Sequence, residues 1–314
     1  MKNREYHSED ELLRKGEELI SKSLFDIHGN LSQKKYPGKG GFGNKVEELH
    51  YQIENNNRQE PDVANLGIEI KTNSLKRLLN KAIVAKERVV LGMIDFSELV
   101  LEDFDTSSYL KKNRIILFNM YLYDKNLKDY DYRFLLVDII KISKEDVDVI
   151  KRDWNIIKGK AQNLKAEEIS QSDTEYLAAV TKGGKNQKPQ PYQVGSKVGK
   201  AKRRAFAYKG PFINHLLQDY SLIKEDGKEY FVKNKKPKKY FKIMTSVHDG
   251  NIGKAVEEKF SSFIGLEDIK IADFFGYKDS FLKAIDKSRW HWNTSLILTG
   301  KRKKYLSNYI EEFS

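Results

Sequence analysis

The sequence predicts an α/β fold in which a mixed β-sheet is flanked by helices on both sides. Four runs rich in Ile, Val, Leu and Tyr are separated by polar segments, as the strands of a sheet are. They occupy residues 66–72, 88–94, 114–123 and 133–141. Segments with a helical spacing of apolar residues precede and follow these runs, so we expect helices to cover the sheet.

The N-terminal region predicts two helices joined by a loop. A helix over 8–22 begins with Ser8 and Glu11 at the spacing of a capping box. Residues 31–45 are rich in Gly, Lys and Pro and predict a loop, and a second helix is expected near 44–54. The apolar face of the first helix consists of Leu12, Leu13, Leu19 and Ile20.

A longer helix is predicted after the fourth strand-like run. Ser143 is suited to cap its N-terminus. Four large apolar residues then follow at helical spacing, and this pattern favours a place in the core over a functional site. They are Val147, Ile150, Trp154 and Ile157.

The composition limits the class of protein. The chain has 314 residues, which indicates one large domain or two modest ones, and the 39% of hydrophobic residues are enough for a core. The absence of Cys excludes disulfides and thiolate zinc sites and favours a cytoplasmic location. The sequence contains no run of about 18 apolar residues, so no membrane-spanning helix is expected. The charged N-terminus lacks the apolar region of a secretory signal.

The positive charge of the chain indicates a polyanionic partner. A net charge of +12 favours nucleic acid as the partner, because each Lys or Arg that contacts a phosphate releases a condensed counterion. The alternative is a lysine-rich surface without such a partner. No Asp or Glu occurs from Leu177 to Gln218. A long stretch of one sign is better explained by a phosphate backbone than by a basic loop without a ligand. Its cations are Lys182, Lys185, Lys188, Lys197, Lys200, Lys202, Arg203, Arg204 and Lys209.

The segment PDVANLGIEIKT, residues 61–72, carries the most informative chemistry. Alternate side chains of a strand share a face, so Glu69 and Lys71 are expected on one face and Ile68 and Ile70 on the core side. Asp62 arrives from just upstream across a short turn. Two converging carboxylates form a hard-oxygen site suited to Mg²⁺, and a lysine beside them can orient a water or stabilise charge on a phosphate. Phosphodiester hydrolysis needs these parts.

The spacing of these three residues is weak evidence by itself. In a chain that is 32% charged, such a match arises readily by chance. The Pro before Asp62 and the apolar strand around Glu69 and Lys71 strengthen it. The alternative is a surface strand with a salt-bridged Glu/Lys pair.

The block KGGFGNKVEELH…PDVANLGIEIKT resembles the signature of the MutH family. That family includes the methyl-directed mismatch-repair nickase and type II restriction endonucleases that cut GATC. The segments VIKRDWNIIK, TEYLAAVTKG and RRAFAYKGPFINHLL follow in the family's order, so the resemblance covers about residues 8–220. The restriction branch is the more similar, because its members carry a stretch like TSSYLKKN, a TKG after Tyr-Leu and a C-terminal extension.

The resemblance implies a restriction-endonuclease-like (MutH-type) mixed sheet flanked by helices, with a basic C-terminal lobe. It also implies a Mg²⁺-dependent type II restriction endonuclease that hydrolyses double-stranded DNA at GATC and leaves 5′-phosphates. A strand-nicking repair enzyme and a non-catalytic DNA-binding module remain as alternatives. The extension past residue 220 argues against the first, and the intact catalytic triplet argues against the second.

The resemblance also suggests a division of the chain. It assigns residues 1–220 to a catalytic endonuclease domain and leaves 221–314 as a C-terminal extension or the start of a truncated second domain. Restriction members often carry a second nuclease-like domain, for which the residues after 220 are too few. Double-stranded DNA is the expected partner, with dimerisation on DNA left open.

By resemblance, Asp62 and Glu69 hold the metal ion together with the backbone carbonyl of Ile70, and Lys71 is the catalytic lysine. A second family lysine maps to Lys112, which on the alternative interpretation is only the solvated start of a strand.

The family also has a glutamate on the helix before the triplet. Counting from Gly43 gives Glu47, while counting back from Asp62 gives Glu48, and we prefer Glu47. The alternative is that Glu47 is an ordinary residue on the helix surface.

Lys39 of the glycine-rich loop is similar to a DNA-contacting lysine of the family. The alternative is that Lys39 matters only for the conformation of the loop. The arm that enters the grooves in the family matches Lys182, Lys202, Arg203, Arg204 and Lys209. In the repair branch a tyrosine that makes cutting sensitive to adenine methylation occupies the position of Ala207 here. A methyl side chain leaves space for an N6-methyl group, so methylation-independent cutting is expected. A shift of one residue would put Tyr208 there instead.

Overall fold

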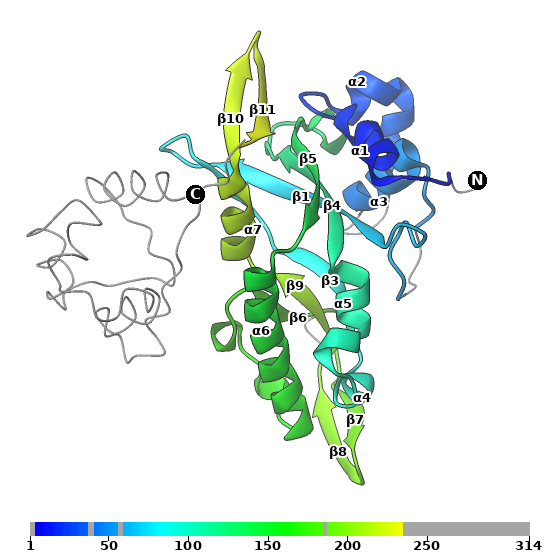
Figure 1. Ribbon diagram of the computed structural model, residues 1–314, viewed down its shortest axis with the longest axis vertical. Helices are drawn as coiled ribbons and strands as arrows, with labels where there is room; N and C mark the ends of the chain where they lie inside the picture. Colours follow the sequence, from blue (N-terminus) through cyan, green and yellow to red (C-terminus); the bar gives the residue numbers. More distant parts are fainter. Residues whose placement is uncertain (1–3, 37–40, 56–58, 185–186, 235–314) are drawn as a thin grey trace, which may run out of the picture. The chain divides into compact units, whose positions relative to one another are not determined.

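The structure is a computed structural model, and it describes residues 4–36, 41–55, 59–184 and 187–234 (Figure 1). The chain divides into two compact units, 1–232 and 233–314. All but the last two of the described residues belong to the first unit. Most of the predicted region 221–314, including the basic and aromatic segments after residue 234, lies outside the described residues, so the predicted domain division stays a prediction.

The first sheet is mixed, as predicted. It contains β1 (Ile68–Arg77), β2 (Ile83–Ala85), β4 (Ile115–Leu122) and β5 (Phe134–Lys141) in the order β2-β1-β4-β5. β1 runs parallel to β4, while the β1–β2 and β4–β5 pairs are antiparallel. Its long strands are three of the four predicted from apolar runs.

The remaining predicted strand, residues 88–94, belongs to a second sheet. β3 (Val89–Ile94) pairs with β9 (Arg204–Tyr208), and β9 pairs with β6 (Leu177–Thr181), all antiparallel. The sequence could not show this, because β9, the partner of β3, lies more than 100 residues away in the acid-free stretch.

The acid-free stretch contains four strands, β6 to β9, and is not one continuous loop. Between β6 and β9 it forms a hairpin of β7 (Gln190–Val194) and β8 (Lys197–Ala201). Tyr192 anchors this hairpin, because its buried ring packs 5.3 Å from Phe96 between ring centroids. A further two-stranded hairpin consists of β10 (Tyr220–Glu225) and β11 (Lys228–Lys233).

The predicted helices are present with altered ends. α1 spans Glu9–Glu17, and the Glu11 amide donates to Ser8 Oγ as predicted; the Glu11 carboxylate, however, accepts from the amide of His7, so the capping box is incomplete. α6 spans Lys144–Gln162 with Ser143 as its cap, as predicted. The remaining helices are α2 (Leu24–His28), α3 (Gly41–Lys45), α4 (Phe96–Leu99), α5 (Ser108–Asn113) and α7 (Gly210–Leu216).

The second predicted helix differs in kind and in start. It begins at Gly41, inside the predicted loop, and continues after α3 as a π-helix over Val46–Tyr51. Gln52, in the left-handed region with φ 58°, ends it. Short 3₁₀ turns complete the backbone at Gly29–Gln33, Phe104–Thr106, Asp129–Asp131, Ala166–Glu168, Gln171–Asp173 and Leu217–Asp219.

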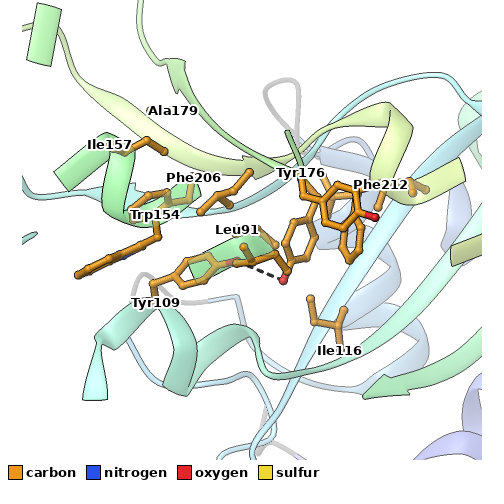
Figure 2. Packing of buried hydrophobic residues seen from close by; sticks show 14 of the residues in the cluster. Leu91, Tyr109, Ile116, Trp154, Ile157, Tyr176, Ala179, Phe206 and Phe212 are labelled. Carbon is orange, nitrogen blue, oxygen red and sulfur yellow. Dashed lines mark hydrogen bonds between the residues drawn. The ribbon is translucent and has the colours of Figure 1, made fainter. Parts of the chain in front are cut away.

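Two hydrophobic clusters fix the two faces of the first sheet. Ile68, Ile70 and Leu117 face a cluster with α1 and the π-helix. On the other face, Ile116 and Phe118 join a larger cluster with the second sheet and α6. Figure 2 shows part of this second cluster around Trp154, Tyr109 and Phe206. Ile150, Trp154 and Ile157 are buried there and Val147 packs against them, which confirms the predicted core face of α6.

No described helix is both long enough and apolar enough to cross a membrane.

Candidate active site

A tight turn brings Asp62 back against the first residues of β1. Val63 and Ile68 exchange backbone hydrogen bonds of 2.9 and 3.2 Å around the turn, and Gly67 adopts φ +67°, which glycine tolerates without steric cost. Asp62 Oδ2 then accepts from the amide of Ile70 at 2.9 Å, while the Asp62 amide donates to Glu69 Oε2 at 3.2 Å. The two carboxylates are therefore held together by the backbone itself.

The alternation along β1 is as predicted. Ile68 and Ile70 are fully buried on one face, while Glu69 and Lys71 lie on the other. Lys71 Nζ donates to Glu69 Oε1 at 2.5 Å. The side chain of Glu69 is 1% exposed and that of Lys71 is 19% exposed, so the pair is largely removed from water rather than on an open surface. The alternative of an exposed salt-bridged pair does not fit this burial.

A second lysine reaches the same carboxylate from a different element. Lys112 Nζ lies 3.6 Å from Glu69 Oε1, and its side chain is 15% exposed. Lys112 sits in the last turn of α5, whereas β4 begins only at Ile115. The interpretation of Lys112 as the solvated start of a strand is therefore wrong, and α5 brings this side chain to the site.

Glu47 is the glutamate of the π-helix that interacts with this group. Burial raises the pKa of Glu47 to about 8, and the nearby carboxylates of Asp62 and Glu69 add to the effect. Glu48 has other partners, since its Oε1 accepts from Asn55 Nδ2 at 2.7 Å. Of the two positions that counting left open, the geometry favours Glu47.

The surroundings of Glu69 disfavour its ionised form. Burial raises the pKa of Glu69 to about 6, with Asp62 acting in the same direction and Lys71 and Lys112 opposing it. Burial also lowers the pKa of Lys71, but Glu69 and Asp62 outweigh that effect and leave it above its ordinary value. Lys71 is therefore a cation at neutral pH.

The donor chemistry fits a hard divalent cation. Asp62 and Glu69 offer carboxylate oxygens and Ile70 a backbone carbonyl, the ligand types that Mg²⁺ takes alongside retained waters. The raised pKa values of Glu47 and Glu69 reflect repulsion and poor solvation of charge that such a cation would relieve. Within the described part of the chain, no three Asp, Glu, His or Cys side chains form a ready-made cation cluster.

The predicted DNA-contacting cations fall into two groups. Arg203 is exposed, and Lys182 and Lys202 are partly exposed, which leaves them available to a ligand. Arg204 is 8% exposed and donates to the carbonyls of Ala179 and Glu167. That arrangement gives Arg204 a structural role and removes the support for a phosphate contact.

Three other predicted positions carry less support. Lys209 Nζ donates to the carbonyls of Gln171 and Thr174, so its charge is also used within the protein. Ala207 is fully buried in β9, where it pairs with Val90 and Ala178. Lys39 lies outside the described residues.

Tyr109 is a residue that sequence reasoning missed. It lies on α5, three residues before Lys112, and its hydroxyl donates to Tyr208 Oη at 3.2 Å, the contact drawn as a dashed line in Figure 2. Tyr109 belongs to the segment TSSYLKKN, which resembles the restriction branch of the family. Its spacing of three residues from Lys112 indicates that the two side chains are neighbours if this segment is a helix. Its partner Tyr208, however, is 99 residues away in the chain.

Comparisons with known proteins give two matches to this chain. The family model described as DNA mismatch repair enzyme MutH matches residues 51–153, a range that includes Asp62, Glu69, Lys71 and Lys112. The chain is also 30% identical over 274 residues to the type II restriction enzyme Sau3AI of Staphylococcus aureus. That match covers 86% of this chain and 53% of the relative, so the chain spans about half the length of the curated protein it matches. Both matches support the MutH-like endonuclease family for this chain, near the branch that Sau3AI represents.

Proposed function

We propose that this chain is a metal-dependent endonuclease that hydrolyses phosphodiester bonds in double-stranded DNA. The observation that carries the proposal is the convergence of Lys71 and Lys112 on the buried carboxylate of Glu69, with Asp62 tied to the same strand by its backbone. A phosphodiester carries the negative charge that two lysines beside a cation site can neutralise.

Each residue of the site has a distinct proposed role. Asp62, Glu69 and the carbonyl of Ile70 would hold Mg²⁺, which when bound supplies Lewis-acid stabilisation of charge on the phosphate. Lys71 Nζ lies within hydrogen-bond distance of Glu69 and would orient the attacking water or stabilise the attacked phosphate. Attack of that water on phosphorus, in line with the 3′ oxygen, would break the P–O3′ bond and leave a 5′-phosphate and a 3′-hydroxyl.

The proposed role of Lys112 is to share the charge of Glu69. Because both lysines approach Oε1 of this carboxylate, Lys112 would keep Glu69 ionised while Lys71 serves the phosphate. Glu47, with its raised pKa, would be protonated in the metal-free enzyme and would lose its proton when a cation binds.

The finer proposal is a type II restriction endonuclease that cuts GATC. The similarity to Sau3AI, which is named as a type II restriction enzyme, supports it. The match to a family model described as a mismatch-repair enzyme supports a second candidate, a strand-nicking repair endonuclease. The two differ in the number of strands that one encounter breaks.

Digestion of a supercoiled plasmid of known sequence tests both candidates. With Mg²⁺, linear products whose mapped ends fall at GATC and carry 5′-phosphates are expected. An open-circle product that accumulates without linearisation would favour the nickase. No strand breakage in Mg²⁺ or Mn²⁺, with DNA binding intact, would overturn the endonuclease proposal and leave the non-catalytic module. Asp62→Asn protein from the same preparation controls for contaminating nuclease.

The exposed part of the basic stretch is proposed to bind DNA phosphates. Changing Lys182, Lys202 and Arg203 together to Gln is expected to weaken DNA binding and to reduce the slope of log affinity against log salt by about 2 to 3, because each lost contact releases one counterion fewer. Fluorescence anisotropy over a salt series measures this slope.

The matched control for this experiment removes three exposed lysines from other elements, Lys125, Lys128 and Lys144. We expect a much smaller change of slope in this control. Equal slopes for the wild type and the first triple variant would show that this stretch does not contact phosphates.

Cleavage is proposed to be independent of adenine methylation. Ala207 offers no ring against an N6-methyl group, and Tyr208 is 1% exposed with its hydroxyl engaged by Tyr109, so neither residue supplies a phenol for discrimination. Plasmid from hosts with and without adenine methylation is expected to be cut at equal rates. Strong protection of the methylated plasmid would contradict the argument from these two residues.

A further inference from the structure

The short helix α5 connects two parts of the molecule that have different proposed tasks. Its C-terminal turn carries Lys112, 3.6 Å from Glu69 of the candidate active site. Its N-terminal turn carries Tyr109, which is 5% exposed and packs on β9 with a distance of 5.0 Å between its ring centroid and that of Phe206. β9 in turn follows directly on Lys202 and Arg203, the exposed cations proposed to bind DNA.

The contact between α5 and β9 ends in a pair of buried hydroxyls. Tyr109 Oη donates to Tyr208 Oη at 3.2 Å, and the two tyrosines are 5% and 1% exposed. A buried donor is costly to leave without a partner, so this hydrogen bond restrains the depth and rotation of Tyr109 against β9. The ring of Tyr208 is itself held by Phe212, at 4.7 Å between centroids, so it cannot easily follow a displaced Tyr109.

The other contacts of α5 make it move as one piece. Ser107 Oγ accepts from the Leu110 amide at 3.2 Å and fixes the start of the helix. Asn113 Nδ2 donates to the Tyr109 carbonyl at 2.8 Å and ties its end to its first turn. Residues three apart in a helix are neighbours on its surface, so a rotation that displaces the Tyr109 ring also displaces the base of Lys112.

We propose that Tyr109 is a positioning residue for Lys112, and that its hydroxyl contact with Tyr208 makes the approach of Lys112 to Glu69 depend on the placement of β9. The proposal rests on the proposed endonuclease function. It adds a defined path by which the segment beside the DNA-binding cations can influence the catalytic carboxylate. An error of about 1 Å in the placement of such a group can lower a rate by up to about a hundredfold.

Tyr109→Phe tests this path because it removes one oxygen and keeps the ring. The matched control is Tyr176→Phe. Tyr176 is 4% exposed in the same core cluster and has a hydrogen-bonded side chain, through Asp146, and its ring packs on Phe212 of α7. Both variants lose a buried hydroxyl, so they are expected to lose similar thermal stability.

The first measurement does not depend on cleavage. In the metal-free full-length chain, the rate of reductive methylation of Lys112 is followed by peptide mass spectrometry. Loss of pairing with Glu69 is expected to raise this rate about threefold in Tyr109→Phe, because an amine that is no longer held against the carboxylate is more accessible to the reagent. Tyr176→Phe is expected to leave it unchanged. An unchanged Lys112 rate in Tyr109→Phe, or an equal rise in both variants, would overturn the proposal.

The second measurement is a double-mutant cycle on single-turnover cleavage at saturating DNA. Tyr109→Phe is expected to lower the rate constant about tenfold in the wild-type background, and by less than about twofold in Lys112→Ala, where no lysine remains to be misplaced. Equal losses in both backgrounds would show a general structural defect and overturn the positioning role. If the wild-type chain cleaves nothing, the endonuclease proposal fails, and the methylation rates still decide whether Tyr109 positions Lys112.

Discussion

Replacing Lys71 by Ala is expected to lower the single-turnover cleavage rate by about a thousandfold while changing DNA affinity by less than about threefold. The reason is that a preorganised charge beside the reacting phosphate acts mainly in the transition state. The phosphate contacts that dominate affinity lie elsewhere. Asp62→Asn and Glu69→Gln are expected to behave in the same way, because each removes charge from the proposed cation site.

The control for Lys71→Ala is Lys76→Ala. Lys76 lies on the same strand, is exposed, and is outside the site. The Lys76 variant tests whether removal of any lysine from β1, and not of Lys71 in particular, lowers the cleavage rate. Near wild-type cleavage by the Lys71 or Asp62 variant, or an equal loss in the Lys76 variant, would refute the site assignment.

Replacing Glu47 by Gln is expected to lower cleavage by at least about tenfold and at the same time to stabilise the metal-free protein. The pKa of Glu47, raised to about 8 by burial and by Asp62, means that the folded state holds its proton more tightly than the unfolded state. The native state therefore loses stability as pH rises from the unfolded value of about 4.3 through the folded value, where the buried carboxylate must ionise.

The Glu47→Gln variant does not lose stability in this way, because its side chain cannot ionise. Its melting temperature in EDTA is expected to exceed that of the wild type by about 5 °C at pH 8, and the difference is expected to vanish near pH 4. Differential scanning calorimetry at several pH values measures this. Glu48→Gln serves as the control, since Glu48 accepts a hydrogen bond from Asn55 away from the carboxylate group. If Glu48→Gln rather than Glu47→Gln lost cleavage, the register of the π-helix would be off by one residue.

Much of the fold could be predicted because its signals are local. The four apolar runs, the cap at Ser143 and the apolar face of α6 depend on neighbouring residues, and all are present. The assignment of β3 to a second sheet could not be predicted, because its partner β9 lies in a stretch whose charge pattern indicated binding rather than strand formation.

The candidate site shows the same division. Strand geometry alone placed Glu69 and Lys71 on one face, since successive side chains of any strand alternate. Two counts along the sequence left Glu47 and Glu48 open, because the loop before Asp62 varies in length; the electrostatic interaction of Glu47 with Asp62 and Glu69 supports the preference for Glu47. Arg204 shows what composition cannot predict. The sequence shows its positive charge, but only the structure shows that its guanidinium donates to two backbone carbonyls.

The sequence by itself thus predicted the mixed sheet, the shared face of Glu69 and Lys71 and the likeness to the family, because strand alternation and motif order depend only on the order of residues along the chain. Only the tertiary structure decided that Lys112 meets Glu69, that Glu47 belongs to the carboxylate group and that Tyr109 contacts Tyr208. These relations join segments 15 to 99 residues apart. They depend on how α5, the π-helix and β9 pack, and packing follows from the burial of all three elements together rather than from the residues of any one.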